Sequence, residues 1–298
     1  MVMKNSMKTK EKITGLLFIT PVMIQFSVFF LLPLGICIYA GFTNWNVLVT
    51  DKTFIGVANF VELFHDVKFW KALGNTIYML IPIPIYLSLA LLFALACHKK
   101  VPGNNVFRVL YYLPFISSIV ALVLVWKWLF NSQFGLINNI LLQVFGIVGP
   151  NWLGDPVWTK RMIVFMISWK MIGIIAIYYL AALKNIPKTY YEAAVIDGAS
   201  PIKQFFKITL PLLTPITFYL SIVGMIGSLQ TFVEVQLFTS NGGRNYGVAT
   251  VIYYIWQKGF SYSQMGYACA TATIFGLLIL FITIIQFKIS KKWVYEGE

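Results

Sequence analysis

Six long apolar stretches dominate this sequence of 298 residues and limit the folds that are open to it. Each is long enough to cross the hydrocarbon core of a bilayer, which is about 30 Å thick and takes roughly 20 helical residues. They run over residues 13–40, 72–97, 109–130, 162–183, 212–233 and 264–287. None alternates polar and apolar residues as the strands of a membrane barrel do. The sequence therefore predicts an all-α polytopic membrane protein with six transmembrane helices, forming a single transmembrane domain over residues 1–298.

The composition excludes the soluble and the disordered classes of protein. Apolar residues make up 59% of the chain and charged residues only 11%, whereas soluble domains contain about 25% charged residues. An aromatic content of 17% is also far from that of a disordered chain. The cysteines, Cys37, Cys97 and Cys269, lie in separate apolar stretches, so no spacing indicates a metal site or a disulfide framework.

We interpret the net charge of +13 as a signal for the orientation of the spans rather than for nucleic-acid binding. The segments on the side of the two termini carry twice as many Lys and Arg residues as the opposite segments. The positive-inside rule therefore predicts that both termini lie in the cytoplasm. The first apolar run is too long for a signal peptide, so we expect it to be a retained span.

The cytoplasmic segment 184–211 has the signals of two short helices joined by a turn. Pro187 can begin a helix, and residues 190–196 form a short amphipathic stretch. Gly198 is suited to end that helix, and Pro201 prevents its continuation. A second helix is expected over residues 202–208. The segment is therefore predicted to be a rigid helix–turn–helix at the cytoplasmic surface.

The side chains of this segment are those of a docking surface. Glu192 and Asp197 are the acids of an otherwise basic segment and could pair with arginines of a partner protein. Ala193 and Ala194 leave one helix face smooth, so that another protein can approach closely.

The stretch from Glu192 to Pro211 resembles the EAA loop of binding-protein-dependent ABC importers. That pattern is EAA, three residues, Gly, nine residues, then Ile-x-Leu-Pro, and every fixed position is matched, by Glu192, Ala193, Ala194, Gly198, Ile208, Leu210 and Pro211. Further segments resemble the carbohydrate-uptake branch of the family, of the maltose and glycerol-phosphate type, at residues 69–76, 112–115, 126–130, 151–156, 241–243 and 265–267. One departure is Arg244, where the family often has Pro after the Gly pair.

The resemblance implies a type I importer permease in a bacterial cytoplasmic membrane. It further implies a second homologous permease chain, two cytoplasmic ABC ATPase subunits that bind ATP and Mg²⁺, and an extracytoplasmic solute-binding protein. The sequence agrees that the chain is not itself an ATPase, because no Gly-Lys dipeptide of a P-loop occurs in it. We expect no catalytic residue, metal or cofactor in this chain.

The substrate implied by the resemblance is a sugar, and we expect a di- or oligosaccharide. The alternative is glycerol-3-phosphate or another polyol phosphate, to which Lys170 and Lys127 would offer positive charge. A secondary transporter is less consistent with the sequence, because no span interior carries Asp or Glu and no repeat relates the two halves. A membrane-embedded enzyme would need a cluster of His, Cys or acidic residues, which the sequence lacks.

The fifth span carries the main candidates for a substrate path. Ser221, Gly224, Ser228, Thr231 and Glu234 recur at spacings of three or four, which places them on one face of a continuous helix. The hydroxyls could bind sugar hydroxyls, and Gly224 would leave room for a sugar ring.

The fourth span adds Lys170, because a charge at bilayer depth indicates a functional site. Gly173 is expected to share its face. Further candidates for the path are Asn75 and Tyr78 in the second span and Lys127 in the third, which could lie with Glu234 at the outer mouth. The structural alternative is that Lys170 only pairs with Glu234 or with a backbone carbonyl, and that the small residues only pack helices.

Overall fold

The computed structural model describes residues 2–48, 52–98 and 104–295, which are almost entirely helical. These residues form two compact units. The first unit contains the chain before Asp66 together with Ile255–Phe275. The second contains Asp66–Tyr254 together with the chain from Gly276 onward.

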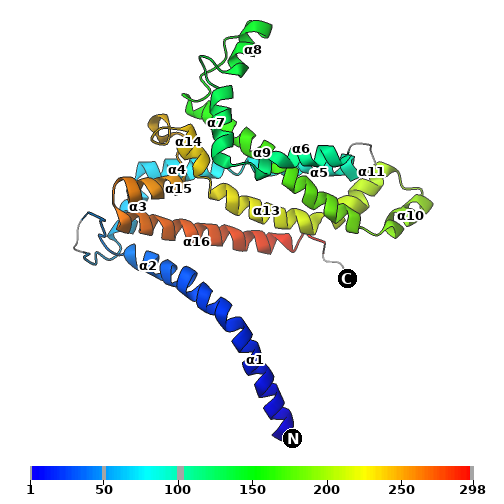
Figure 1. The fold of residues 1–298 in the computed structure, drawn as a ribbon, viewed down its shortest axis with the longest axis horizontal. Coiled ribbons are helices and arrows are strands. Elements are labelled where there is room, and N and C mark those ends of the chain that lie inside the picture. The colour runs from blue at the N-terminus through cyan, green and yellow to red at the C-terminus, as the bar shows by residue number, and fades with distance from the viewer. Residues whose placement is uncertain (1, 49–51, 99–103, 296–298) are drawn as a thin grey trace. The chain divides into compact units, whose positions relative to one another are not determined.

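The first unit begins with one long, gently curved helical run (Figure 1). Its parts are α1 (Val2–Phe26), a π-helical turn (Ser27–Leu31) and α2 (Leu32–Ala40). The short helix α3 (Ala58–His65) follows. The end of α15 (Val251–Trp256), a π-helical turn (Gln257–Ser261) and the start of α16 (Met265–Ser290) complete the unit.

The second unit is a helical bundle organised around α9. Its helices are α4 (Val67–Tyr78), α5 (Pro82–His98), α6 (Asn104–Ile116), α7 (Ile119–Leu129), α8 (Leu136–Phe145), α9 (Pro156–Asn185), α10 (Lys188–Ile196), α11 (Pro201–Gln204), α12 (Leu210–Leu212), α13 (Thr214–Leu229) and α14 (Val233–Phe238). The long helix α9 packs against α5 and α6, α13 packs against α5, and α14 packs against α7. Figure 1 shows α10 and α11 at one end of this unit.

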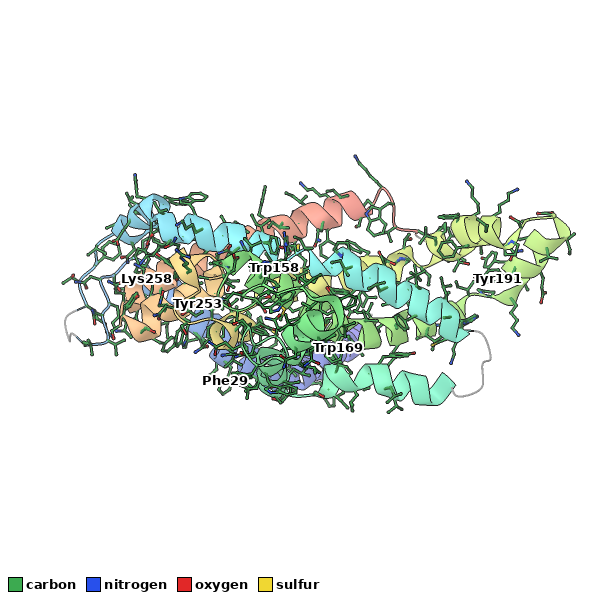
Figure 2. The ribbon with its side chains drawn as sticks, turned by 90° about the horizontal axis from the view of Figure 1, so that it is seen from above. Phe29, Trp158, Trp169, Tyr191, Tyr253 and Lys258 are labelled. Atoms are coloured by element: carbon green, nitrogen blue, oxygen red, sulfur yellow. The ribbon has the colours of Figure 1, made fainter. Side chains whose placement is uncertain are left out.

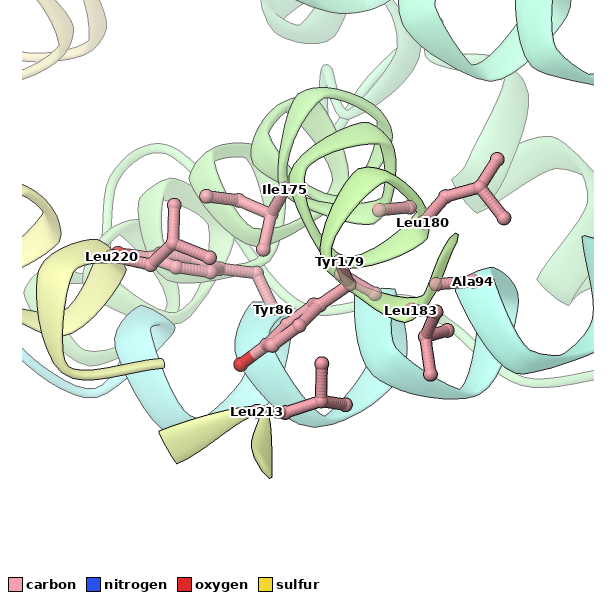
Figure 3. Close-up of a cluster of buried hydrophobic side chains, with 10 residues drawn as sticks. Tyr86, Ala94, Ile175, Tyr179, Leu180, Leu183, Leu213 and Leu220 are labelled. Atoms are coloured by element: carbon pink, nitrogen blue, oxygen red, sulfur yellow. The ribbon is translucent and has the colours of Figure 1, made fainter. Parts of the chain in front are cut away.

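The apolar core of the second unit lies between α5, α9 and α13 (Figure 3). Tyr86, Ala90 and Ala94 are spaced by four residues, so that they share the buried face of α5. The two alanines let α9 approach closely, as small residues do in membrane bundles. Tyr179 of α9 donates a hydrogen bond from its hydroxyl to Oγ1 of Thr217 at 3.1 Å, which ties α9 to α13.

The helices confirm the prediction of an all-α polytopic membrane protein. Four helical runs are individually long and apolar enough to cross a bilayer: Thr14–Ala40, Val67–His98, Pro156–Asn185 and Met265–Ser290. Two further candidates are bent pairs, Val109–Ile116 with Ile119–Leu129 at 103° and Pro201–Leu212 with Thr214–Leu229 at 57°. The described residues thus provide four spans, or six if each bent pair is one span.

Two of the six predicted spans are bent: the stretch over 109–130 within its length, and the stretch over 212–233 at its start. The first bend follows Pro114 and lies at a pair of serines, and sharp kinks occur at both kinds of residue. The second bend lies between Pro211 and Pro215, which lack the backbone N–H groups that a helix needs. There the hydroxyl of Thr214 donates to the carbonyl of Pro211 at 2.6 Å, which satisfies an acceptor that the bend leaves open.

Candidate functional site

The turn between α10 and α11 has the geometry that the sequence predicts. Gly198 has a φ of +69°, in the left-handed region that favours glycine. The amide of Ala199 donates to the carbonyl of Ala194 at 2.8 Å, and that of Gly198 donates to the carbonyl of Val195 at 3.0 Å. These two bonds form a Schellman motif, which ends α10 sharply.

Side-chain bonds hold the second half of this helix–turn–helix in place. Ser200 caps α11 by accepting the amide of Lys203 through Oγ at 3.4 Å. Tyr191 of α10 and Thr209 share a hydrogen bond between their hydroxyls at 2.9 Å. Tyr191, labelled in Figure 2, was not among the predicted residues. Its partner lies 18 residues away, so no local pattern could indicate the pair.

The surface of this segment is open in the isolated chain. Glu192, Ala193, Asp197 and Gly198 are exposed and Ala194 is half-buried, and α10 has no buried residue. Ile196 is 86% exposed. The predicted motif residues that follow the turn, Ile208, Leu210 and Pro211, are half-buried where the chain joins the bundle. The structure thus presents two acids and an apolar side chain on a fixed turn.

A cavity of about 290 Å³ lies in the second unit between α5, α9, α13 and α14. We call it the Lys170 cavity. It brings together several of the predicted path residues, namely Lys170, Gly224, Ser228, Thr231 and Glu234. Its lining also includes Tyr86 and Gln230, which were not predicted.

The two charged side chains of the Lys170 cavity are not paired with each other. Lys170 and Glu234 are both half-buried. In the part of the chain that the structure describes, neither makes an ion pair or a side-chain hydrogen bond. The alternative that Lys170 serves only to pair with Glu234 or with a backbone carbonyl is therefore not what the structure shows.

Tyr86 gives Gly224 a role beyond the predicted one. A Cβ atom on Gly224 would collide with the hydroxyl of Tyr86, so the room beside this glycine is occupied by the tyrosine. Tyr86 is only 1% exposed, and its hydroxyl has no hydrogen-bond partner among the described residues. The glycine lets this hydroxyl, which has no partner among the described residues, reach the wall of the cavity. That Gly224 leaves room for a sugar ring stays a prediction.

The expected continuous face of the fifth span was wrong, because α13 ends at Leu229. The hydroxyl of Thr231 donates back to the carbonyl of Ser228 at 2.8 Å, a local bond that competes with continued helix. Thr231 and its neighbour Phe232 therefore lie in a break, and Glu234 lies on the separate helix α14. The break still leaves Ser228, Thr231 and Glu234 on the same cavity.

Two predicted path residues of the fourth and fifth spans lie outside the lining of the Lys170 cavity. Ser221 donates its hydroxyl to the carbonyl of Phe218 at 2.8 Å, within its own helix. Gly173 is buried, and a Cβ atom there would collide with the carbonyl of Tyr111 on α6. Gly173 therefore allows α9 to pack closely on α6 and, unlike Lys170, is not among the residues that line the cavity.

Asn75 and Tyr78 form a separate cluster with Lys160, another residue that was not predicted. Asn75 is buried, and its Nδ2 donates to the carbonyls of Tyr246 and Ala249 at 3.1 and 3.0 Å. Its Oδ1 accepts a hydrogen bond from Lys160 Nζ at 3.0 Å. The same ammonium lies 5.1 Å from the centroid of the Tyr78 ring. The amide of Asn75 is bonded to protein on both its nitrogen and its oxygen and holds the segment around residues 246–249, and its place in the substrate path stays a prediction.

Lys127 likewise has a structural partner. Its Nζ donates to the carbonyl of Leu237 at 3.0 Å, near the C-terminal end of α14. A cation at that end interacts favourably with the free carbonyls and the helix dipole. This contact joins α7 to α14, and the prediction that Lys127 lines the path stays untested by it.

Comparison with known families identifies the chain over most of its length. Residues 77–295 match the model of a family described as binding-protein-dependent transport system inner membrane component. The match includes both the helix–turn–helix and every residue of the Lys170 cavity.

Individual relatives and a solved structure agree with that match. The lactose transport system permease protein LacF of Rhizobium radiobacter is 34% identical, covering 97% of this chain and 98% of the relative. The arabinooligosaccharides transport system permease protein AraP of Bacillus subtilis is 32% identical, covering 96% and 91%. A chain of a bacterial alginate ABC transporter, solved with an alginate pentasaccharide-bound periplasmic protein, has a TM-score of 0.84 at 24% identity, covering 99% of both chains. This last likeness shows the fold.

Proposed function

The chain belongs to the family of binding-protein-dependent transport system inner membrane components, and from this premise we propose that it is the membrane-spanning permease of an ATP-driven importer that carries an oligosaccharide into a bacterial cell. The observation that carries the proposal is the exposed helix–turn–helix α10–α11, which has the family's motif on a fixed turn. Family membership also favours an ABC permease over a secondary transporter.

In this proposal the segment 184–211 is the docking element for a cytoplasmic ATPase. Glu192 and Asp197 would pair with arginines of the ATPase, and the exposed Ile196 would enter an apolar part of its surface. ATP and Mg²⁺ would be bound by that partner rather than by this chain. Closure of the ATPase pair would draw this loop and that of a second permease together and turn the bundle towards the outside. Both termini would then lie in the cytoplasm, with a solute-binding protein on the opposite face.

The proposed substrate path runs along the Lys170 cavity. Ser228 contributes a hydroxyl to the wall, and Tyr86 contributes a hydroxyl that has no partner among the described residues. A buried hydroxyl without a hydrogen bond is costly, so a sugar hydroxyl or water in the cavity would relieve that cost. Lys170 and Glu234 would gain hydrogen bonds from the same polar ligand.

The charges of the cavity favour a neutral sugar over a polyol phosphate. Lys170 and Glu234 contribute one positive and one negative side chain to the same wall. A phosphate group would be attracted by the ammonium of Lys170 but repelled by the carboxylate of Glu234. Sugar hydroxyls can donate to the carboxylate and accept from the ammonium at once.

A charge reversal in the docking element tests the coupling part of the proposal. Glu192→Lys should abolish uptake and reduce co-purification of the ATPase, because it places like charges against a basic docking cleft. The same reversal at Glu62, an exposed acid of α3 outside the segment 184–211, is the control for ATPase association alone, which it should leave unchanged. Uptake that is unchanged with Glu192→Lys would show that this segment is not the docking element.

The substrate class is tested by uptake into cells that express the complete importer. Lactose, arabinotriose and glycerol-3-phosphate would be compared as labelled substrates. Saturable, ATP-dependent uptake of either oligosaccharide supports the proposal. Uptake of glycerol-3-phosphate alone would replace the oligosaccharide by the polyol phosphate.

A further inference from the structure

A second pocket, of about 210 Å³, lies entirely within the first unit. We call it the Trp45 pocket. It is formed by the segment after α2, by α3 and by the start of α16, and its described lining consists of amide side chains, one carboxylate and two aromatic rings. The charge distribution of the sequence predicts that these segments lie on the extracytoplasmic side. Neither the docking element nor the Lys170 cavity includes any of its residues.

Backbone contacts hold the walls of the Trp45 pocket together. The amide of Gly266 donates to the carbonyl of Trp45 at 2.8 Å, and that of Val47 donates to the carbonyl of Ser263 at 3.0 Å. A Cβ atom on Gly266 would collide with the carbonyl of Thr43, so glycine is required for this approach. The first turn of α16 is thus fixed against residues 43–47, and the pocket is preformed, as ligand sites usually are.

Asn59 presents a defined acceptor to the pocket. It is buried, with only 7% of its surface exposed, and its Nδ2 donates to the carbonyls of Gly41 and Thr43 at 2.9 and 2.8 Å. These bonds determine the orientation of the amide. Its Oδ1 makes no hydrogen bond within the described residues, so it is the atom left for a ligand.

Asn44 and Asn46 present the opposite polarity. Each accepts a backbone amide through its Oδ1, at 2.8 and 2.9 Å, which leaves the Nδ2 group as a donor. Glu62 adds an exposed carboxylate, and Gln264 adds an exposed amide that can donate and accept. The lining therefore offers donors and acceptors side by side, which suits hydroxyl groups, since each hydroxyl can donate and accept.

Trp45 gives the pocket an apolar surface beside these polar groups. Lys52 Nζ lies 4.2 Å from the centroid of its ring and covers one face. Aromatic rings pack against apolar groups while neighbouring polar atoms make directed bonds, and a sugar residue combines a C–H face with a rim of hydroxyls. The carboxylate of Glu62 in the lining disfavours an anionic sugar.

We propose that the Trp45 pocket binds one residue of a neutral oligosaccharide on the outer side of the permease. Pockets that enclose a drug-sized ligand have volumes of about 300 Å³ or more, and the Trp45 pocket is smaller. This size suits one sugar residue, with the rest of the oligosaccharide outside the pocket. The pocket then acts as an outer subsite that is distinct from the Lys170 cavity. The choice of sugar as ligand rests on the proposed function.

The test is binding of lactose and arabinotriose to the assembled importer in lipid nanodiscs without the solute-binding protein, measured by saturation-transfer NMR. Gln264→Leu removes an exposed amide that has no recorded side-chain bond, so it should preserve the fold. Loss of one hydrogen bond should weaken binding roughly three- to tenfold. Trp45→Ala should weaken it further. The matched control is Gln133→Leu, an exposed glutamine outside the pocket, which should bind like the unaltered protein.

The outcomes separate this inference from the proposed function. Weaker sugar binding with Gln264→Leu and Trp45→Ala but not with Gln133→Leu supports the Trp45 pocket. Equal sugar binding by all variants overturns it. If the pocket variants bind sugar normally but no longer bind the solute-binding protein, the inference is also overturned, and the pocket is a protein-docking site. If the importer takes up an oligosaccharide while the nanodisc-bound complex shows no sugar signal, the proposed function stands and the outer subsite is wrong.

Discussion

At the scale of single residues, the contact between Gly224 and Tyr86 makes a sharp prediction about stability. Gly224→Ala should destabilise the permease by about 1–3 kcal/mol, because overpacking forces neighbouring atoms to shift. Adding Tyr86→Phe should recover most of this loss, since the next tyrosine atom, Cζ, lies 3.2 Å from the added Cβ. Thermal unfolding of the purified complex measures both effects. Additive losses in the double variant would contradict the contact.

Tyr86→Phe alone distinguishes a packing role from a substrate role. Removing a buried hydroxyl that has no partner among the described residues should leave stability unchanged or raise it by about 1 kcal/mol. We expect oligosaccharide uptake to fall nevertheless, because the cavity loses a hydroxyl. The control is Tyr179→Phe, which removes a hydroxyl that is bonded to Thr217, and should therefore lower stability. Unaltered uptake with Tyr86→Phe would remove this hydroxyl from the path.

At the scale of elements, the turn between α10 and α11 can be tested with a matched glycine. Gly198 and Gly146 both have a positive φ, +69° and +66°, and a Cβ atom would meet nothing within 4 Å at either position. Alanine at either site should therefore cost about 1–2 kcal/mol of backbone strain and nothing from collision.

Only Gly198→Ala should uncouple ATP hydrolysis from uptake, because only this turn belongs to the proposed docking element. The measurement is the ratio of sugar transported to ATP hydrolysed in proteoliposomes. Gly146→Ala, at the end of α8, should lower stability alone. Equal coupling in both variants would mean that the shape of the α10–α11 turn does not matter for the ATPase.

At the scale of the whole molecule, the orientation of the chain is a prediction from its charges. Green fluorescent protein fused to the C-terminus should fluoresce, since it folds in the cytoplasm. Alkaline phosphatase fused after Ser132 should be active, because the segment between α7 and α8 is expected outside. The same enzyme fused after Asn185, before α10, should be inactive. The reverse pattern would place the docking element on the wrong side for an ATPase and would contradict the proposed function.

The class of fold and the docking turn were predictable from the sequence because both depend on residues that are close along the chain. Apolar runs of span length, the end of α10 at Gly198 and the start of α11 after Ser200 are local properties of composition, backbone conformation and capping. The sequence resemblance also led to the correct family, since the motif is a run of neighbouring residues.

The tertiary structure alone decided which polar residues meet. Helical spacing indicates which residues share a face but not what faces them, so it could not show that Tyr86 fills the room beside Gly224. The same holds for Asn75, whose bonds reach residues 171 and 174 positions away. A distant segment also contacts the break after Leu229, where Thr250 donates to the carbonyl of Thr231 at 2.7 Å. Local sequence determined where the helices form, and long-range hydrogen bonds and packing determined which side chains line the cavities, because those interactions exist only after the chain has folded.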